Sequence, residues 1–199
     1  PIDDPDWSPP PGGVSSATEL VALIRSVETR RCARHASAAL RAAVNPLTIA
    51  VAAFPSGNPA AGTSPAQEVE RLLLKQAAGA NFAITQLFWD PEVYISFVDD
   101  AKRAGVTIPI LAGLLVPTDI ERLSRTAELT GIDPPQALSQ TLRDAEGAEA
   151  AVQAGILATA RVARAVLDSG APGLHLYTYN KARPSLGLLA RIGLFDPAA

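Results

Sequence analysis

The chain has 199 residues, with 17 Lys and Arg against 20 Asp and Glu, a formal net charge of −3 and 48% hydrophobic residues. This length predicts one domain with a hydrophobic core of its own. The slightly acidic balance argues against a general nucleic-acid binder. The single cysteine, Cys32, excludes a disulfide framework and a multi-thiolate metal site. No apolar run approaches the roughly 20 residues of a membrane span, so we expect no membrane partner and a cytoplasmic location.

The chain contains no methionine and opens with Pro-Ile-Asp-Asp. An opening rich in Pro and Asp resembles an interior loop more than a native start, so we expect a fragment. Residues 1–14 hold five prolines and two glycines, which predicts a loop.

A first helix is predicted to begin at Ser16 or Thr18, because apolar residues then recur at helical spacing up to Val27. The Arg- and Ala-rich stretch 28–43 extends this helix or adds a second one. Its basic residues predict a solvated helix face: Arg25, Arg30, Arg31, Arg34 and Arg41. His35 has no metal-ligand partner nearby in the sequence.

From residue 45 onwards, short apolar runs alternate with helical segments. The runs predict strands buried on both faces, at 48–54, 82–88, 108–115 and 173–178. Cap residues and helical periodicity predict helices at 64–79, 90–105, 118–131, 135–143, 148–167 and 185–192. Capping boxes are predicted at Ser64 with Gln67 and at Thr118 with Glu121.

This alternation predicts an α/β fold built from parallel βα units. Four strands are compatible with half of a closed eight-stranded barrel or with a small, open, doubly wound sheet. No Gly-x-Gly-x-x-Gly fingerprint follows any strand, which argues against the open sheet as a dinucleotide-binding module. Counting strands does not separate the two architectures.

No standard catalytic motif is present, neither a nucleophile elbow nor a zinc-binding or phosphate-binding motif. His175 alternates with Leu174 and Leu176 within the last strand, which favours a packed histidine. Gln86 lies in an otherwise apolar strand, where an amide is costly to bury without partners. It is therefore a candidate for binding a polar heterocyclic ligand.

Several segments occur in the order found in methylenetetrahydrofolate reductases. The most specific one, at residues 79–94, reads GANFAITQLFWDPEVY. It is preceded by AVAAFP at 50–55 and followed by IPILAGL at 108–114 and GLHLYTYN at 173–180. The chain therefore resembles that family from about residue 16 to residue 195.

The resemblance implies a (β/α)8 TIM barrel, of which this chain supplies roughly the last four strands. Residues 1–199 would then form a single domain, the C-terminal half of the barrel. Members of the family use NADH or NADPH to reduce bound FAD, which then reduces 5,10-methylenetetrahydrofolate to 5-methyltetrahydrofolate. The family's principal acidic proton donor belongs to the absent first strands, so no catalytic residue is assigned here. A small folate is the implied partner, and an oligomer of identical subunits is compatible with the resemblance.

The resemblance also implies a substrate site and a cofactor site. Gln86 and Tyr177 match substrate-site residues, whereas Arg122 and Lys181 stand where the family has Gln and Arg. The implied FAD site has two matching residues and three departures. The matches are Ala17 and Lys75, the latter facing the diphosphate; the departures are Glu68 for Asp, Phe54 for Tyr and Asn58 for His.

Further departures are Ser16 for an aromatic residue and Thr126 for Phe. Together the departures weaken the inference of FAD more than that of folate. Direct hydride transfer from the nicotinamide to the folate, without flavin, is one alternative; a non-catalytic, folate-binding relative is another. If FAD binds, Glu68 and Lys75 should point toward the mouth formed by the C-terminal ends of the strands. Otherwise they could pair with each other, two turns apart on one helix face.

Overall fold

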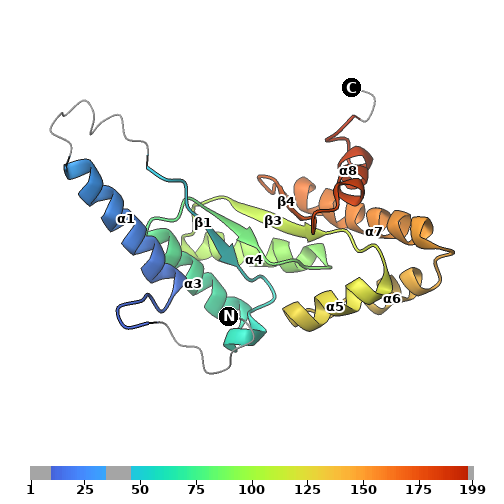
Figure 1. The fold of residues 1–199 in the computed structure, drawn as a ribbon, viewed down its shortest axis with the longest axis horizontal. Helices are drawn as coiled ribbons and strands as arrows, with labels where there is room; N and C mark the ends of the chain where they lie inside the picture. The colour runs from blue at the N-terminus through green and yellow to red at the C-terminus, as the bar shows by residue number, and fades with distance from the viewer. Residues whose placement is uncertain (1–9, 35–45, 197–199) are drawn as a thin grey trace.

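The computed structural model describes residues 10–34 and 46–196, and Figure 1 shows its helices and strands. Four strands alternate with helices along the chain, as the sequence predicts. The elements are α1 (Ala17–Ala33), β1 (Ala50–Ala53), the short 3-10 helix η1 (Pro59–Ala61), α3 (Pro65–Ala77), β2 (Phe82–Thr85), α4 (Pro91–Ala104), β3 (Ile110–Leu115), α5 (Ile120–Thr130), α6 (Gln136–Arg143), α7 (Ala148–Asp168), β4 (Leu174–Tyr177) and α8 (Ala182–Arg191).

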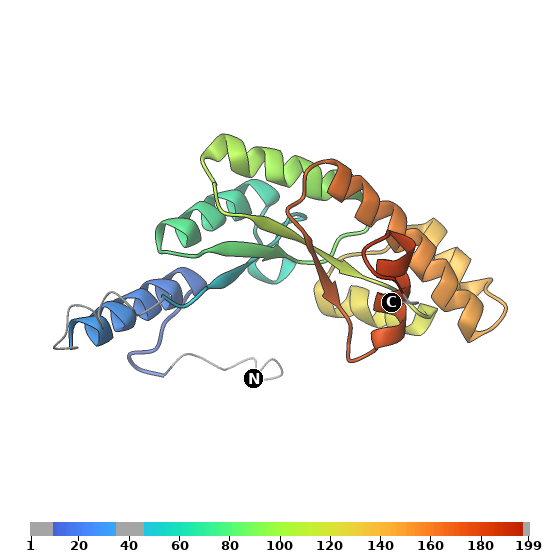
Figure 2. The same cartoon turned by 90° about the horizontal axis from the view of Figure 1, so that it is seen from above.

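The four strands form one parallel sheet in the order β1-β2-β3-β4. This confirms the predicted α/β fold with a parallel sheet. A doubly wound sheet reverses its strand order at a switch point, and the described strands show no such reversal. Helices α3, α4 and α7 lie together on one side of the sheet (Figure 2). The described part of the chain is therefore wound in one direction only, as a segment of a barrel is.

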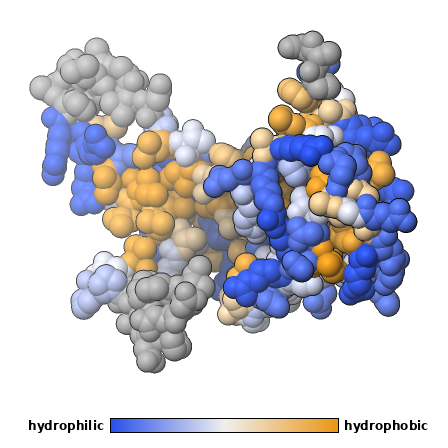
Figure 3. All heavy atoms as spheres, turned by 45° about the vertical axis from the view of Figure 1, so that its right-hand side comes forward, coloured by the Kyte–Doolittle hydropathy of each residue, from blue (hydrophilic) through white to orange (hydrophobic). Residues whose placement is uncertain are grey.

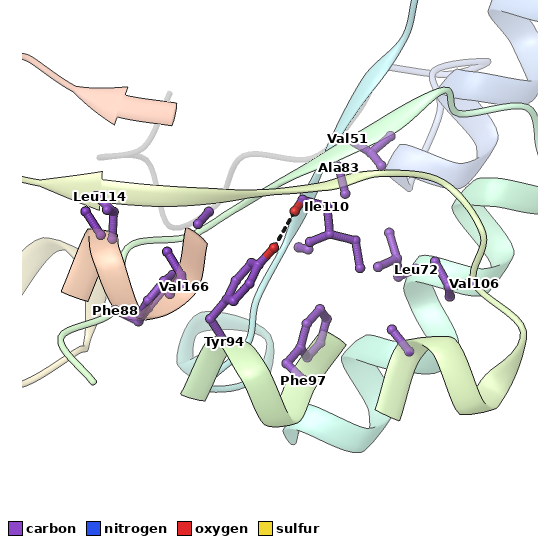
Figure 4. Packing of buried hydrophobic residues seen from close by; sticks show 14 of the residues in the cluster. Val51, Leu72, Ala83, Phe88, Tyr94, Phe97, Val106, Ile110, Leu114 and Val166 are labelled. Carbon is purple, nitrogen blue, oxygen red and sulfur yellow. Dashed lines mark hydrogen bonds between the residues drawn. The ribbon is translucent and has the colours of Figure 1, made fainter. Parts of the chain in front are cut away.

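The core lies between the sheet and these three helices. Alternate strand residues are buried there, among them Val51, Ala83, Ala112 and Leu114. Large side chains of the helices pack against them (Figure 4): Leu72 from α3, Tyr94 and Phe97 from α4, and Val166 from α7. The opposite face of the sheet is less covered, because Phe82, Ile84, Leu111 and Tyr177 are half-buried and Ala50 and Ala52 are exposed.

Two predicted capping boxes have different outcomes. The box at the start of α3 is confirmed, since Ser64 accepts from the Gln67 backbone and the Gln67 side chain accepts from the Ser64 backbone. At α5 the prediction is wrong: the cap is Asp119, whose carboxylate accepts from the Arg122 backbone at 2.8 Å. The Thr118 hydroxyl donates to Asp119 instead. The Asp119 carboxylate lies one residue nearer to the helix than the Thr118 hydroxyl, so it is the group that accepts from the unpaired amide of the first turn.

Arg25 corrects the prediction that the basic residues near α1 form a solvated face. Its guanidinium donates to the Gly79 carbonyl at 2.8 and 3.0 Å, to Glu28 at 2.6 Å and to the Leu47 carbonyl at 2.9 Å. It thereby ties α1 to the segments that precede β1 and β2. The remainder of the Arg- and Ala-rich stretch, residues 35–43, lies outside the described residues, as do residues 1–9 of the predicted loop.

Helix α7 is long and apolar enough to cross a membrane by length and composition, with 21 residues and an 18-residue window of mean hydropathy 1.3. This corrects the prediction that no apolar run approaches that length. Seven of its residues are buried, including Ile156, Ala163 and Val166. The helix packs on β3, α4, α6 and α8, as a core helix of an α/β fold does. No cluster of three or more potential metal ligands occurs among the described residues.

Tyr94 provides a pH-dependent test of this core. Its hydroxyl donates to the Ile110 carbonyl at 2.7 Å, and burial raises its pKa to about 12. Because the folded state favours the neutral phenol, this stabilisation is complete below pH 10 and is lost as the pH rises toward 12. We expect Tyr94→Phe to lower the free energy of unfolding by about 1 kcal/mol at neutral pH. Urea unfolding measures this, with the exposed Tyr179→Phe as a control that leaves stability unchanged; equal effects of the two variants would contradict the prediction.

Candidate functional site

A cavity of about 280 Å³ lies at the C-terminal ends of β3 and β4, between α5 and α8. We call it the strand-end cavity. Three of the substrate-site residues implied by the resemblance meet there, namely Arg122, Tyr177 and Lys181, together with Thr126. The remaining lining residues are Leu115, Val116, Pro117, Thr118, Leu123, Arg125, Leu129, Thr178, Tyr179, Pro184 and Ser185. The fold thus brings together residues that lie up to 70 positions apart in the sequence, from Leu115 to Ser185.

Tyr177 is held in place by a contact that spans three strands. Its side chain starts on β4, and its hydroxyl donates to the Thr85 carbonyl of β2 at 2.9 Å. To do so the ring passes over β3 at Gly113, where an added Cβ would lie 3.0 Å from the ring and 2.1 Å from the Thr85 carbonyl oxygen. The Gly113 amide donates to the Thr85 hydroxyl at 2.8 Å. Burial first, and then Tyr179, raises the pKa of Tyr177, so its hydroxyl stays a donor.

His175 lies beside Tyr177 on the same strand. The two rings meet edge to face, with centroids 4.8 Å apart and an interplanar angle of 75°. His175 is half-buried, and this ring contact agrees with the prediction of a packed histidine. Since both side chains point to the less covered face of the sheet, His175 supports the ring of Tyr177 on that face.

Gln86 follows β2 and does not line the strand-end cavity. Its backbone amide donates to the Ala53 carbonyl at 2.7 Å, and its side-chain oxygen accepts from the Leu87 backbone at 2.9 Å. The residue is half-buried and lies just after β2, which corrects the prediction that it belongs to the strand. Its side-chain NH2 group has no hydrogen-bond partner within the described part of the chain and remains able to donate to a ligand.

Glu68 and Lys75 of α3 lie at the β1 edge of the sheet, the edge opposite β4. Glu68 is 1% exposed; one of its oxygens accepts from the Thr63 hydroxyl at 2.5 Å and from Arg71 at 3.0 Å, and the other has no partner. The Lys75 ammonium donates to the Ala52 carbonyl at 2.7 Å. Burial lowers the pKa of Lys75, and the nearby Glu68 opposes this shift. No ion pair joins Glu68 and Lys75 in the described chain, contrary to the pairing considered for a flavin-free protein.

The remaining implied cofactor residues are Asn58, Phe54 and Ala17. Asn58 and Thr63 close the loop after β1 through two backbone hydrogen bonds of 2.9 and 3.1 Å, and Thr63 links this loop to Glu68. Phe54 is half-buried at the end of β1, and Ala17 is exposed at the start of α1. None of these residues lines the strand-end cavity.

These contacts test whether the β1 end suits the diphosphate and ribityl chain of FAD. The unpartnered Glu68 oxygen could accept a hydrogen bond from a hydroxyl group. Arg71 is paired with Glu68 through one terminal nitrogen only and is 48% exposed, so it keeps other donors. Lys75, the residue that the resemblance assigns to the diphosphate, is buried and donates to the Ala52 carbonyl, so its ammonium as placed does not fit that role.

The three-strand contact generates a testable prediction. An alanine at position 113 would place its Cβ against the backbone of Thr85, which has no room to move. We expect Gly113→Ala to lower the free energy of unfolding by about 3 kcal/mol and to displace the ring of Tyr177. Gly173→Ala is the matched control, because its Cβ would meet only the end of the Leu111 side chain at 3.1 Å. Urea unfolding measures both, and a Gly113→Ala protein as stable as the control would refute the contact.

Comparison with known proteins agrees with the fold. A protein from Clostridium thermocellum, described as binding two copies of 5-methyl-5,6,7,8-tetrahydrofolic acid, superposes with a TM-score of 0.51 at 19% identity. The match covers 78% of this chain and 56% of that one. At this level of identity the likeness shows a shared α/β fold alone.

Sequence comparisons identify the family. A probable methylenetetrahydrofolate reductase (NADPH) of Caenorhabditis elegans is 35% identical over 155 residues, which are 76% of this chain and 23% of that protein. A 5,10-methylenetetrahydrofolate reductase of Escherichia coli is 30% identical over 147 residues, 73% of this chain and 49% of that protein. This chain thus spans half or less of each relative's length. The family model for methylenetetrahydrofolate reductase matches residues 1–193, and the chain belongs to that family.

Proposed function

We propose that residues 1–199 form a single domain that supplies the last four β/α units of an eight-stranded barrel. The consecutive parallel order β1-β2-β3-β4 supports this, as does the position of α3, α4 and α7 together on one side of the sheet. In a barrel, the less covered face of this sheet would face the interior.

The free edge of β1 supports the same proposal. The Ile49 and Ala53 carbonyls accept from the β2 side of the sheet, so the Ala52 carbonyl points to the opposite edge. Lys75 donates to that carbonyl, where a neighbouring strand would otherwise donate. A further strand next to β1 would complete this pairing.

The helices bear on what the remainder of the proposed barrel would contain. Helix α1 precedes β1 and packs beside α3, and α8 follows β4 and packs on α7. The described segment therefore begins and ends with a helix. Four further strands that closed the barrel would need only the three helices that connect them to one another. A second copy of this chain would bring its own α1 and α8 in addition to the helices between its strands, two helices more than the space requires, which disfavours closing the barrel with two identical halves.

The outer surface of α1 offers a test of this assignment. Leu20, Leu23 and Val27 are 46%, 45% and 39% exposed, and Figure 3 shows apolar side chains on the side where α1 lies. In a barrel this stripe would be covered. We expect the triple change of these residues to Gln to reduce binding of a hydrophobic dye by the isolated chain, at a cost of no more than about 0.5 kcal/mol in stability.

Val21 provides the control for this experiment. It lies on the same helix but is 3% exposed, so Val21→Gln should cost about 2 kcal/mol or more. If the triple change is as destabilising as Val21→Gln, the stripe belongs to the core of this chain, and the assignment of an absent neighbour fails.

We propose that the complete protein reduces 5,10-methylenetetrahydrofolate to 5-methyltetrahydrofolate with a reduced nicotinamide as hydride donor. The strand-end cavity is the observation that carries this proposal, because it gathers Tyr177, Arg122 and Lys181 at the end of the strands where barrel enzymes place their sites. Hydride transfer requires two flat rings held in contact with water excluded, and a largely apolar cavity with polar groups at its rim suits that task.

The residues of this chain would bind and orient rather than donate the proton. Tyr177 presents a fixed ring to a bound aromatic group, and Gln86 offers a free NH2 group at the end of β2. Arg122 and Lys181 offer positive charge at the rim of the cavity. We propose that the proton donor lies in the first half of the barrel, so the isolated chain is inactive.

The family's usual route passes the hydride through FAD, and the direct route passes it from the nicotinamide to the folate. The hydrogen bond of the buried Lys75 ammonium to the Ala52 carbonyl favours the direct route. An absorbance spectrum of the purified full-length protein separates the two: a two-peaked flavin band would support the FAD route, and its absence the direct one.

Gln86 distinguishes a reductase from a non-catalytic, folate-binding relative. In the full-length protein we expect Gln86→Ala to lower kcat/KM for methylenetetrahydrofolate about tenfold to a hundredfold, because polar atoms of the pterin lose their partner. Nicotinamide oxidation dependent on this folate, with and without added FAD, is the assay. Gln153→Ala, on the exposed side of α7, is the matched control. A wild-type protein inactive under both conditions would leave the non-catalytic relative as the function.

A further inference from the structure

A second cavity, of about 470 Å³, lies beside helices α6 and α7, at the segment that follows β2. We call it the α6–α7 cavity. It shares only Leu115 with the strand-end cavity, and none of the residues that the resemblance assigns to a substrate or cofactor lines it. We infer that this cavity binds a small amphipathic carboxylate, with its apolar body in the cavity and its carboxylate on Arg161. The inference does not depend on the proposed reaction.

The walls of the α6–α7 cavity come from the middle of the described sheet. Phe88 and Trp89 follow β2, Leu114 and Leu115 belong to β3, and the other lining residues belong to α6, to its cap Pro135 and to α7. Helices α6 and α7 pack against each other (Figure 1). A strand added beside β1 or β4 would lie at an outer edge of the sheet, so it would not fill this cavity.

Most of the wall is apolar, and part of it is open to solvent. Phe88 and Leu114 are buried, at 3% and 1% exposure, whereas Trp89 and Leu138 are half-buried and Leu157 is 42% exposed. An alkyl or aromatic group gains free energy by covering such a surface. The shape and chemistry of this wall therefore suit the apolar body of a small molecule.

Arg161 is the only charged residue that lines the cavity in the part of the chain that the structure describes. Its guanidinium has no hydrogen-bond or ion-pair partner there, and α7 carries no acidic residue between Glu149 and Asp168. Arg164, one turn further along, differs because it donates to the Arg191 carbonyl at 2.7 Å. The donors of Arg161 are thus free for an anion, and the planar guanidinium matches the two oxygens of a carboxylate.

Trp89 adds a second unused donor. Its indole N–H is buried and has no partner among the described residues, which costs free energy in the empty cavity. The Thr141 and Thr159 hydroxyls already donate to backbone carbonyl groups, at 2.8 and 3.2 Å, so they have no proton left for a ligand. The free groups of the cavity therefore require an acceptor. Because the indole N–H is enclosed, the ring has to turn toward the cavity for a ligand oxygen to reach it.

Binding of octanoate, 1-octanol and octylammonium to the full-length protein tests the inference. The three probes share one alkyl chain and differ in the head group alone. We expect octanoate to bind about tenfold more tightly than 1-octanol, and octylammonium to bind most weakly, because only the carboxylate pairs with Arg161. Arg161→Gln should remove the advantage of octanoate over 1-octanol. Isothermal titration calorimetry at low salt measures the dissociation constants.

Arg164→Gln is the matched control, because Arg164 is also exposed on α7 but does not line the cavity. It should keep the advantage of octanoate. If octanoate binds no more tightly than 1-octanol, or if Arg161→Gln keeps the advantage, the inference is wrong. Neither result affects the reductase assay, so the proposed function stands or fails separately.

The indole N–H of Trp89 gives an independent readout. In protein labelled with ¹⁵N-tryptophan, the indole resonance that is absent from Trp89→Phe belongs to this residue. We expect octanoate to shift this resonance and octylammonium to leave it in place. A resonance that does not move at saturating octanoate would contradict the assignment of the site.

Discussion

Tyr177 reaches across β3 because position 113 has no side chain. Its hydrogen bond to the Thr85 carbonyl links the last strand to the second one, over a glycine whose Cβ would collide with backbone. The Thr85 hydroxyl accepts from the Gly113 amide at the same point, so both polar ends of Thr85 are used. One small residue thus fixes the spacing of three strands and the position of the ring that forms a wall of the cavity.

Local patterns predicted the elements well, because caps and periodicity act over a few residues. Ser64, Asp90 and Gly105 mark helix ends in the structure as they do in the sequence. The predictions that failed depend on contacts between distant segments. Arg25 looks like a surface residue until its contact with Gly79 is seen, and Lys75 looks like a ligand for an anion until its bond to Ala52 is seen.

The site was predictable only through the resemblance to a family. Nothing in the local sequence places Arg122, Tyr177 and Lys181 at one cavity; the parallel order of β3 and β4 does so by bringing their C-terminal ends together. Arg125 was missed as a site residue, since its helical neighbours suggest a solvent-exposed pair with Glu128. Its position one turn from Arg122 on an amphipathic helix was the only signal that could have found it.

The β1 end of the sheet and the β3–β4 end differ in how fully their polar groups are paired. At β3 and β4, Tyr177 and Thr126 donate to carbonyl groups of the described chain, and the cavity is bounded by helices on both sides. At β1, one oxygen of the buried Glu68 carboxylate lacks a partner, and the buried Lys75 ammonium donates to the Ala52 carbonyl at the unpaired edge of the strand. Burying such groups is costly unless they are paired. The arrangement at β1 is therefore the one that a neighbouring strand would change, and with it the orientation of Lys75. The strand-end cavity at β3 and β4 depends on contacts already made within this chain, whereas chemistry at β1 depends on the neighbouring strand proposed above.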